Sequence, residues 1–332
     1  MEYNRLGRSN LMVSKICLGT MHFGPRADEA TSHAILDRAF ELGINFIDTA
    51  NVYGGSEGFG RSEEIIGAWF AGRPEVRDQV VLATKQYAGQ HPDRPNGAAG
   101  FSAYRFRQAL IDSLRRLQTD RVDLYQTHHI DRTVSVEEFW GTYERAIAQG
   151  DVLYAGSSNF SGWGLAMYQL QAWQRGGVGF VSEQTQYNLL SRVPEMEVLP
   201  AAQTFGLGVF PWSPLGRGVL TGQYRARIPK GSRAASDHFA WFVQPYLEQR
   251  SKGVVEAVAR AAQGLDLTPL QVALLWVRDA PGVTAPLLGA RTAGQLAPAL
   301  ATEELTLPDE IVSALDDVSG GPNLLRPSAA RG

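Results

Sequence analysis

Short apolar runs alternate with longer amphipathic stretches along most of the chain. Several of the short runs are almost continuously apolar, as the buried strands of parallel sheets are. Eight of them predict strands, over residues 16–21, 45–50, 80–85, 122–128, 154–159, 181–188, 208–214 and 285–290. The stretches between them have helical spacing, and the one over residues 102–118 places Phe106, Leu110, Leu114 and Leu117 on one face.

The amphipathic stretches predict the helices that follow these strands. They cover residues 30–43, 61–72, 102–118, 135–150, 161–177, 196–206, 252–266, 268–279, 293–301 and 308–318. Eight strand–helix units in succession predict an α/β protein with a (β/α)8 TIM barrel, here a single domain over residues 1–332. A doubly wound sheet is the rival, but it usually carries G-x-G-x-x-G after its first strand, which here ends in Leu18-Gly19-Thr20-Met21.

Two segments do not fit the alternation of strands and helices. Residues 3–14 carry Gly7 between small apolar groups and predict a hairpin that closes the floor of the barrel. Residues 222–250 mix glycine, proline, arginine and aromatic residues, and long irregular insertions on a barrel often serve as lids or binding loops. We expect this insertion and the loops at 22–29 and 86–101 to determine substrate choice.

Composition narrows the class of partner. The net charge of −3 does not indicate a basic surface that would bind a polyanion, so nucleic acid is not an expected partner. The single cysteine, Cys17, excludes an intrachain disulfide and a multi-cysteine metal site. The chain has no run of about 18 apolar residues and no apolar leader, so we expect a cytoplasmic protein without a membrane partner. His128, His129 and Asp131 do not predict a metal site, because adjacent strand residues point to opposite faces.

Polar residues mark the carboxyl ends of the second, third and fourth predicted strands, where active sites of such barrels lie. They are Asp48, Tyr53, Lys85 and His128. Tyrosine is a weak acid, and a nearby ammonium is expected to lower its pKa. An aspartate would keep the lysine charged, and a histidine within reach would position a carbonyl oxygen or assist the proton transfer.

Three of the four residues also have a structural interpretation. Lys85 could be half of a buried ion pair, Tyr53 a rim aromatic, and His128 a polar core residue. The catalytic interpretation is favoured because all four fall at one end of consecutive strands.

The chain resembles the aldo-keto reductase superfamily from about residue 6 to residue 315. The motifs that carry the resemblance are GINFIDTA with Tyr53-Gly54, ATK at 83–85, DLYQ with His128 and Asp131, GSSNF at 156–160 and WSPL at 212–215. The resemblance implies that Asp48, Tyr53, Lys85 and His128 form a catalytic tetrad. It also implies a carbonyl reduction with NADP(H), in which Tyr53 donates the proton.

The resemblance further implies a set of cofactor contacts. Ser158, Asn159 and Gln184 would bind the nicotinamide carboxamide, Trp212 would stack on the ring, and Arg291 would bind the ribose 2′-phosphate. The complete implied set is Gly19, Thr20, Met21, Asp48, Ser158, Asn159, Gln184, Trp212, Ser213, Pro214, Leu215, Gly216, Gly218, Arg233, Gly289, Arg291 and Gln295. The chain departs from the family at Pro298 and Ala299, where many relatives carry glutamate and asparagine as adenine contacts.

Within the superfamily, the chain is similar to the branch of potassium-channel beta subunits and bacterial sugar-pathway reductases. Several channel subunits have asparagine in place of His128, so its presence favours a working reductase. The strings at 125–132, 156–163 and 198–210 resemble reductases of nucleotide-linked 3-keto or 2,3-unsaturated deoxyhexoses. The predicted function is therefore an NADPH-dependent carbonyl reductase, with a keto-deoxysugar of deoxysugar biosynthesis as one candidate substrate.

Three alternatives stay open from the sequence. The chain could be a general aldehyde reductase with no sugar substrate, or a nucleotide-binding regulatory module similar to a channel subunit. It could also be a phosphate-binding barrel isomerase or aldolase, in which the segment Trp212–Leu215 would have no role. A homo-oligomer is compatible with each of them.

Overall fold

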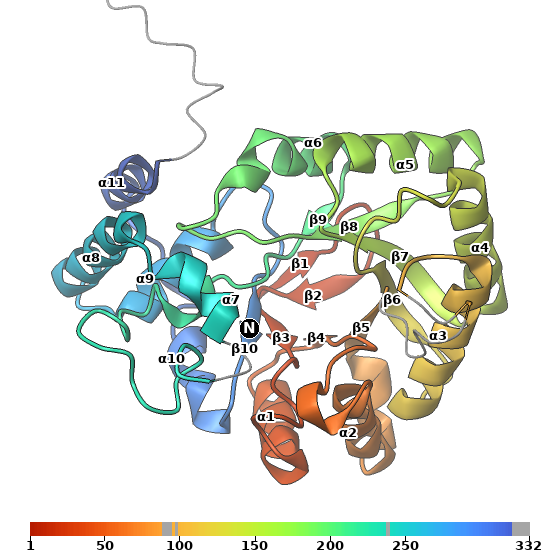
Figure 1. Cartoon of the computed structure of the whole chain (residues 1–332), viewed down its shortest axis with the longest axis horizontal. Coiled ribbons are helices and arrows are strands. Elements are labelled where there is room, and N and C mark those ends of the chain that lie inside the picture. Colours follow the sequence, from red (N-terminus) through yellow and green to blue (C-terminus); the bar gives the residue numbers. More distant parts are fainter. Residues whose placement is uncertain (88–94, 97–98, 237–239, 321–332) are drawn as a thin grey trace, which may run out of the picture.

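Eight parallel strands form the centre of the protein (Figure 1). The computed structural model describes residues 1–87, 95–96, 99–236 and 240–320. The strands are β3 (Cys17–Gly19), β4 (Phe46–Asp48), β5 (Val81–Gln86), β6 (Val122–Thr127), β7 (Val152–Ser158), β8 (Phe180–Gln184), β9 (Gly208–Val209) and β10 (Leu287–Gly289). They pair in the order β10-β3-β4-β5-β6-β7-β8-β9. A parallel bridge from Val209 to Val283 links β9 back to the approach to β10. The predicted (β/α)8 fold is confirmed.

Helices surround this sheet. They are α1 (Glu29–Glu41), α2 (Arg61–Ala71), α3 (Ala103–Leu117), α4 (Val136–Gln149), α5 (Gly162–Gln174), α6 (Val198–Phe205), α7 (Ala240–Val243), α8 (Gln249–Gly264), α9 (Pro269–Arg278), α10 (Ala297–Leu300) and α11 (Asp309–Ser319). Helix α4 shows how the sequence sets their ends. The Ser135 hydroxyl accepts from the Glu138 N–H at the start, and Gly150 adopts φ +83° at the end. In the described part of the chain, we find no helix long and apolar enough to cross a bilayer.

The structure corrects several predicted boundaries. Strand β9 is shorter than predicted, because Pro211 and Pro214 lack the N–H that a ladder requires. The stretch over 293–301 is a 3-10 turn (Ala293–Gln295) followed by α10, and Pro298 again lacks a donor there. The insertion at 222–250 is not irregular throughout, since it contains α7, a 3-10 turn (Gln244–Tyr246) and the start of α8.

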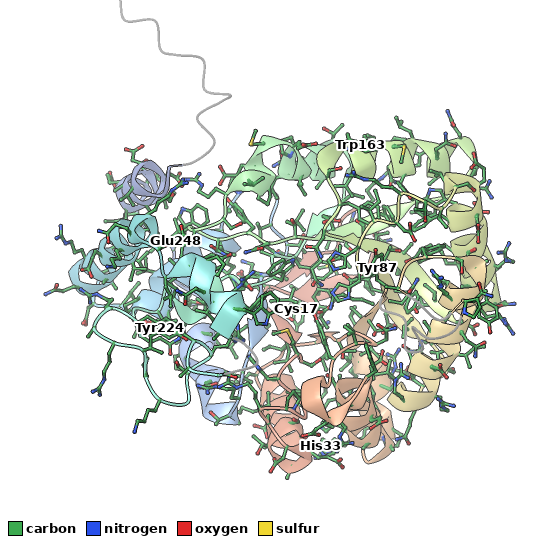
Figure 2. The ribbon with its side chains drawn as sticks, viewed as in Figure 1. Cys17, His33, Tyr87, Trp163, Tyr224 and Glu248 are labelled. Carbon is green, nitrogen blue, oxygen red and sulfur yellow. The ribbon has the colours of Figure 1, made fainter. Side chains whose placement is uncertain are left out.

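The predicted hairpin is confirmed, and it closes the N-terminal end of the barrel. Strands β1 (Tyr3–Arg5) and β2 (Met12–Ser14) pair antiparallel. Leu6 and Val13 are fully buried among side chains that point into the barrel, including Cys17, which Figure 2 shows near its centre. A Cβ on Gly7 would lie 2.3 Å from the Val181 carbonyl oxygen, so only glycine permits this approach. Apolar side chains thus fill the barrel at this end. The buried polar residues Asp48 and Lys85 lie toward the opposite end.

A bulge in β8 determines which of its side chains face that opposite end. Ala155 of β7 pairs with Phe180, whereas the next residue, Gly156, pairs with Ser182. One residue of β8 is therefore unmatched, and the alternation of its side chains shifts beyond that point. As a result, Gln184 points into the barrel and Glu183 points toward the surrounding helices.

Candidate active site

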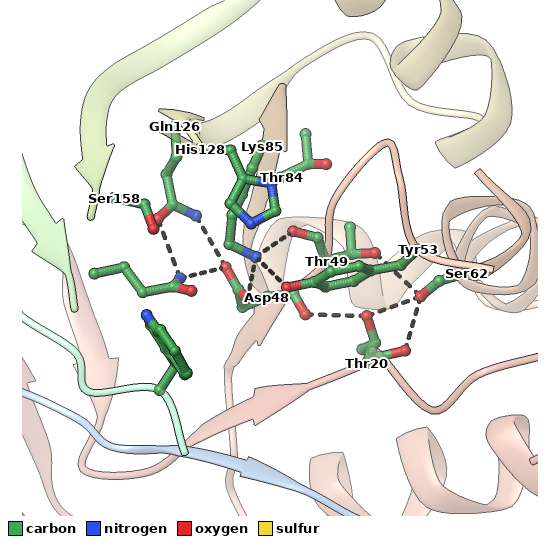
Figure 3. Close-up of polar contacts among 12 residues, drawn as sticks. Thr20, Asp48, Thr49, Tyr53, Ser62, Thr84, Lys85, Gln126, His128 and Ser158 are labelled. Carbon is green, nitrogen blue, oxygen red and sulfur yellow. Dashed lines mark hydrogen bonds and ion pairs between the residues drawn. The ribbon is translucent and has the colours of Figure 1, made fainter. Parts of the chain in front are cut away.

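The ammonium of Lys85 lies at the centre of a buried polar cluster at the carboxyl end of the barrel (Figure 3). Its Nζ donates to Asp48 Oδ2 at 2.6 Å, to the Thr49 carbonyl oxygen at 2.8 Å and to the Tyr53 hydroxyl at 3.2 Å. Lys85 and Asp48 are both 0% exposed. All three protons of the ammonium therefore have acceptors, as a charge without access to water requires.

The three side chains meet because of where the chain places their backbones. Asp48 is the last residue of β4, and Lys85 lies in β5 on the same inward face. Tyr53 follows β4 in a turn closed by its N–H, which donates to the Ala50 carbonyl oxygen at 3.0 Å. The turn depends on Gly54, with φ +156°, because a Cβ there would lie 1.8 Å from the Gly58 carbonyl oxygen.

Two glutamine amides orient the carboxylate of Asp48. Gln126 Nε2 donates to Asp48 Oδ1 at 2.9 Å, and Gln184 Nε2 donates to the same oxygen at 3.0 Å. Both oxygens of the carboxylate therefore have donors, which fixes it against Lys85. Sequence reasoning assigned Gln184 to the cofactor alone and gave Gln126 no role. The signal for Gln126 was its position two residues before His128, which places both side chains on the same face of β6.

Burial and charge set the protonation states of the cluster. Burial alone would lower the pKa of Lys85, but Asp48 and Tyr53 raise it above its ordinary value, so the lysine is charged. Burial lowers the pKa of His128 well below its ordinary value, and Lys85 lowers it further, so this histidine is neutral at pH 7. The rings of His128 and Tyr53 are nearly perpendicular, with centroids 6.1 Å apart.

Lys85 lowers the pKa of Tyr53 as expected, but the net shift of this pKa is upward. Burial raises this pKa more than the neighbouring Lys85 lowers it, and Asp48 adds to the rise. The net pKa lies above the ordinary value of 10.0. Tyr53 is therefore a neutral phenol throughout the physiological range, with an ammonium in place to receive the charge if the proton leaves.

An amide bridge adjoins the cluster. Asn159 Nδ2 donates to the His128 carbonyl oxygen at 3.1 Å and to Ser158 Oγ at 3.0 Å, and Trp212 Nε1 donates to Asn159 Oδ1 at 3.0 Å. The structure thus brings Ser158, Asn159 and Trp212 together beside Gln184, as the predicted ring-binding group requires.

A cavity of about 310 Å³ lies next to this group. The predicted cofactor residues among its lining are Ser213, Pro214, Leu215, Gly218, Arg233, Gly289, Arg291 and Gln295. Gly216 is buried within the same turn. Sequence reasoning missed His22, Arg26 and Arg217, which also line the cavity. No motif distinguishes them from ordinary loop residues, and His22 and Arg26 belong to a loop that we expected to contact substrate.

The cavity is strongly cationic. Burial and the charges of Arg26 and Arg291 lower the pKa of Arg233 to about 10. The Arg26 and Arg291 guanidiniums converge on one acceptor, the Gly231 carbonyl oxygen, at 2.8 and 3.2 Å. Among the described residues, His22 Nδ1, Arg217 Nε and Ser232 Oγ are buried without a hydrogen-bond partner, and all three residues line this cavity. Unpaired donors and crowded cations indicate a site for an anion.

The other predicted cofactor residues lie elsewhere. Gly19 pairs with Asp48 and with Gly289 in the sheet. The Thr20 hydroxyl donates to the Asp48 carbonyl oxygen at 3.0 Å, and Met21 follows in the adjoining turn. Ala299 is fully buried, so it faces the core rather than a ligand. Part of the predicted substrate loop at 86–101 lies outside the described residues.

Comparison with known proteins agrees with this geometry. Residues 15–319 match the Aldo/keto reductase family. The chain belongs to the aldo/keto reductase family. It is 44% identical to an uncharacterized oxidoreductase, YrpG, of Bacillus subtilis (strain 168), with 99% of each chain covered. It is 34% identical to a probable voltage-gated potassium channel subunit beta of Oryza sativa subsp. japonica, over 89% of each chain. It is 28% identical to a versiconal hemiacetal acetate reductase of Aspergillus parasiticus, over 96% of each chain. Its class is therefore oxidoreductase.

Removing the carboxylate of Asp48 should destabilise the protein strongly. Asp48→Asn leaves the Lys85 ammonium buried without its counter-charge, which costs about 3–5 kcal/mol of unfolding free energy. Urea unfolding measures this loss. The control is Glu64→Gln, whose carboxylate pairs with Arg61 at 3.3 Å on the surface, and it should change the free energy by less than about 1 kcal/mol. Equal stability of Asp48→Asn and wild type would contradict the assigned charges.

Proposed function

We propose that the protein is an NADPH-dependent carbonyl reductase, in which Tyr53 donates the proton to the substrate oxygen. The observation that carries the proposal is the geometry of Tyr53, Lys85 and Asp48, a neutral phenol bonded to a buried ammonium that a carboxylate keeps charged. An acid of this kind can protonate a carbonyl oxygen, because the resulting phenolate is stabilised by the adjacent cation.

The residues that line the site and the cavity fit nicotinamide adenine dinucleotide phosphate. The Trp212 indole and the Ser158 and Asn159 side chains would hold the nicotinamide ring at the edge of the cluster, and the bound ring supplies the reducing equivalent. The backbone N–H groups of Ser213, Leu215 and Arg217 would bind the pyrophosphate together with the Arg233 guanidinium, since Pro214 has no N–H and those of Gly216 and Gly218 donate within the turn. Arg26 and Arg291 converge at the far end and would bind the ribose 2′-phosphate, which favours NADPH over NADH.

The chain's own groups then divide the work. His128, neutral and next to Tyr53, would donate a hydrogen bond to the carbonyl oxygen and orient it. Tyr53 would release its proton to that oxygen as negative charge develops there. Lys85 would stabilise the phenolate across 3.2 Å, and Asp48 would keep Lys85 in place. The proton would return to Tyr53 from solvent after product release.

The substrate class is inferred from a relative's name and from the sequence motifs. The reductase named for versiconal hemiacetal acetate supports a carbonyl substrate in general. The nucleotide-linked keto-deoxysugar stays a prediction from sequence. Comparing kcat/KM for a nucleotide-linked keto-deoxyhexose with that for simple aldehydes separates the sugar reductase from a general aldehyde reductase, since a sugar enzyme should prefer the nucleotide-linked substrate by orders of magnitude.

A regulatory module is the second candidate, because the chain is 34% identical to a probable channel beta subunit. Such a module would bind NADPH and turn over negligibly. The neutral His128 and the complete proton-donating cluster favour catalysis instead. Rapid multiple-turnover oxidation of NADPH in the presence of an aldehyde distinguishes the two.

Replacing Tyr53 by phenylalanine should abolish most of the reduction. Loss of a positioned acid lowers kcat by about 10²–10⁴-fold, and cofactor affinity should change little because the hydroxyl faces the substrate. NADPH oxidation with nitrobenzaldehyde measures turnover, and quenching of tryptophan fluorescence measures binding. Tyr3→Phe is the control, because Tyr3 lies on the hairpin at the opposite end of the barrel. Equal turnover by wild type and Tyr53→Phe would refute the proposed role, as would a wild type inactive across a broad carbonyl panel.

Removing either convergent arginine should weaken NADPH binding selectively. Arg26→Ala or Arg291→Ala deletes a charge-assisted hydrogen bond of about 1.5–3 kcal/mol, which corresponds to a 10- to 100-fold rise in the NADPH dissociation constant. The NADH dissociation constant should barely change. Arg225→Ala is the matched control, since Arg225 pairs with Glu256 on the surface and does not line the cavity. Equal losses for NADPH and NADH would place these arginines away from the 2′-phosphate.

A further inference from the structure

Glu183 is a fully buried carboxyl that contacts only neutral hydrogen-bonding groups among the described residues. It follows the bulge of β8 and points toward the helices, on the face opposite Gln184. Its Oε2 lies 2.5 Å from Ser157 Oγ of β7, and its Oε1 accepts from the Phe160 N–H at 3.1 Å. The Asn159 N–H also faces it, and the Phe210 N–H of the neighbouring strand donates to its main-chain carbonyl oxygen. Within the described residues, no charged side chain contributes to its pKa.

A protonated Glu183 gives each close contact of the Ser157 hydroxyl its own proton. Ser157 Oγ is within reach of two acceptors, Glu183 Oε2 at 2.5 Å and the Ser182 carbonyl oxygen at 3.1 Å, but the hydroxyl has one proton. A protonated Glu183 donates to Ser157 Oγ, and Ser157 then donates to Ser182. Burial accordingly raises the pKa of Glu183 to about 8, against the lowering effect of its hydrogen bonds.

This carboxyl holds the turn that carries the amide bridge of the candidate site. Asn159 has φ +58°, a left-handed conformation that is unusual for a residue other than glycine. Its backbone is held on both sides, by its own N–H bond to the Gln184 carbonyl oxygen at 2.9 Å and by the Phe160 N–H bond to Glu183. The Asn159 side chain then reaches both the His128 carbonyl oxygen and Trp212 Nε1.

We propose that Glu183 is a positioning residue that, as an uncharged acid behind the barrel wall, fixes Asn159 between His128 and Trp212 and so shapes the nicotinamide site. The inference rests on the proposed function, because it assigns the Asn159–Trp212 bridge to the cofactor. Deprotonation leaves an unpaired charge in the wall and removes the donor to Ser157, which loosens the turn. Cofactor affinity should therefore fall as the pH rises through the pKa of Glu183.

The same carboxyl makes folding stability depend on pH. Its pKa is about 8 in the folded chain and near the ordinary 4.5 in the unfolded chain. The unfolded state thus loses this proton first, and the contribution of Glu183 to stability falls as the pH rises from about 4.5 to about 8. Above that range the contribution stays constant.

The test compares three full-length variants with wild type, using NADPH as the probe between pH 7 and pH 9, below the pKa of about 10 of Arg233. In Glu183→Gln, the amide donates to Ser157 and accepts from Phe160, so it mimics the neutral acid and cannot ionise. Its second N–H lacks a partner, which lowers stability equally at every pH. We expect wild-type NADPH affinity to fall at least about threefold above pH 8, and Glu183→Gln to remove that fall. Glu183→Ala should weaken NADPH binding at least tenfold at pH 7, with a smaller effect on kcat at saturating NADPH.

Glu197→Gln is the control. This exposed carboxylate accepts from the Trp163 N–H at the start of helix α5, which begins just after Phe160. It should keep the wild-type pH profile. Infrared spectroscopy gives a readout independent of activity, since a carboxylic-acid C=O band present in wild type at pH 7 should be missing in Glu183→Gln. Absence of that band, or identical NADPH pH profiles for wild type and Glu183→Gln, would overturn the inference alone. A wild type that keeps the band but binds no NADPH at any pH would overturn the proposed function as well.

Discussion

The ammonium of Lys85 is buried at the carboxyl end of the barrel, where its charge must be balanced without water. A cation in such a place is stable only with a carboxylate and a complete set of acceptors. Asp48 supplies the charge, and the Thr49 carbonyl and the Tyr53 hydroxyl supply the remaining acceptors. The requirement extends outward, because Asp48 is itself held by Gln126 and Gln184 from two further strands. Four strands are thus tied to one charge.

The neighbouring cavity is lined by an excess of positive charge, unlike the polar cluster around Lys85. Lys85 and Asp48 neutralise one another, whereas the cavity gathers the guanidiniums of Arg26, Arg233 and Arg291 with buried donors that lack partners. The segment from Trp212 to Gly218 lies between the two regions, with Trp212 bonded to Asn159 and the turn lining the cavity. A ligand with an anionic part and a planar ring would satisfy both regions at once. The buried ion pair and the proposed ligand-binding cavity are therefore adjacent parts of the same rim.

Sequence reasoning located the barrel and the four residues of the polar cluster, because parallel strands bring their carboxyl ends to one rim. It missed what depends on three-dimensional packing. The β8 bulge, which turns Gln184 inward and Glu183 outward, has no local signature. The spacing of residues along the chain also does not predict that a long loop side chain such as Arg26 lines the cavity. The sign of the pKa shift of Tyr53 follows from burial exceeding the effect of Lys85, a balance that only coordinates show.

The proposed proton transfer depends most on Tyr53 being a neutral acid beside a charged lysine. The direct measurement is a spectrophotometric titration of its phenol, taken as the difference between the alkaline ultraviolet titrations of wild type and Tyr53→Phe. Because burial raises the pKa of Tyr53 above 10.0, the midpoint of this residue's phenolate signal should lie above pH 10. A midpoint below pH 10 would show that Lys85 outweighs burial, and a midpoint below pH 7 would contradict the assignment of Tyr53 as a neutral proton donor.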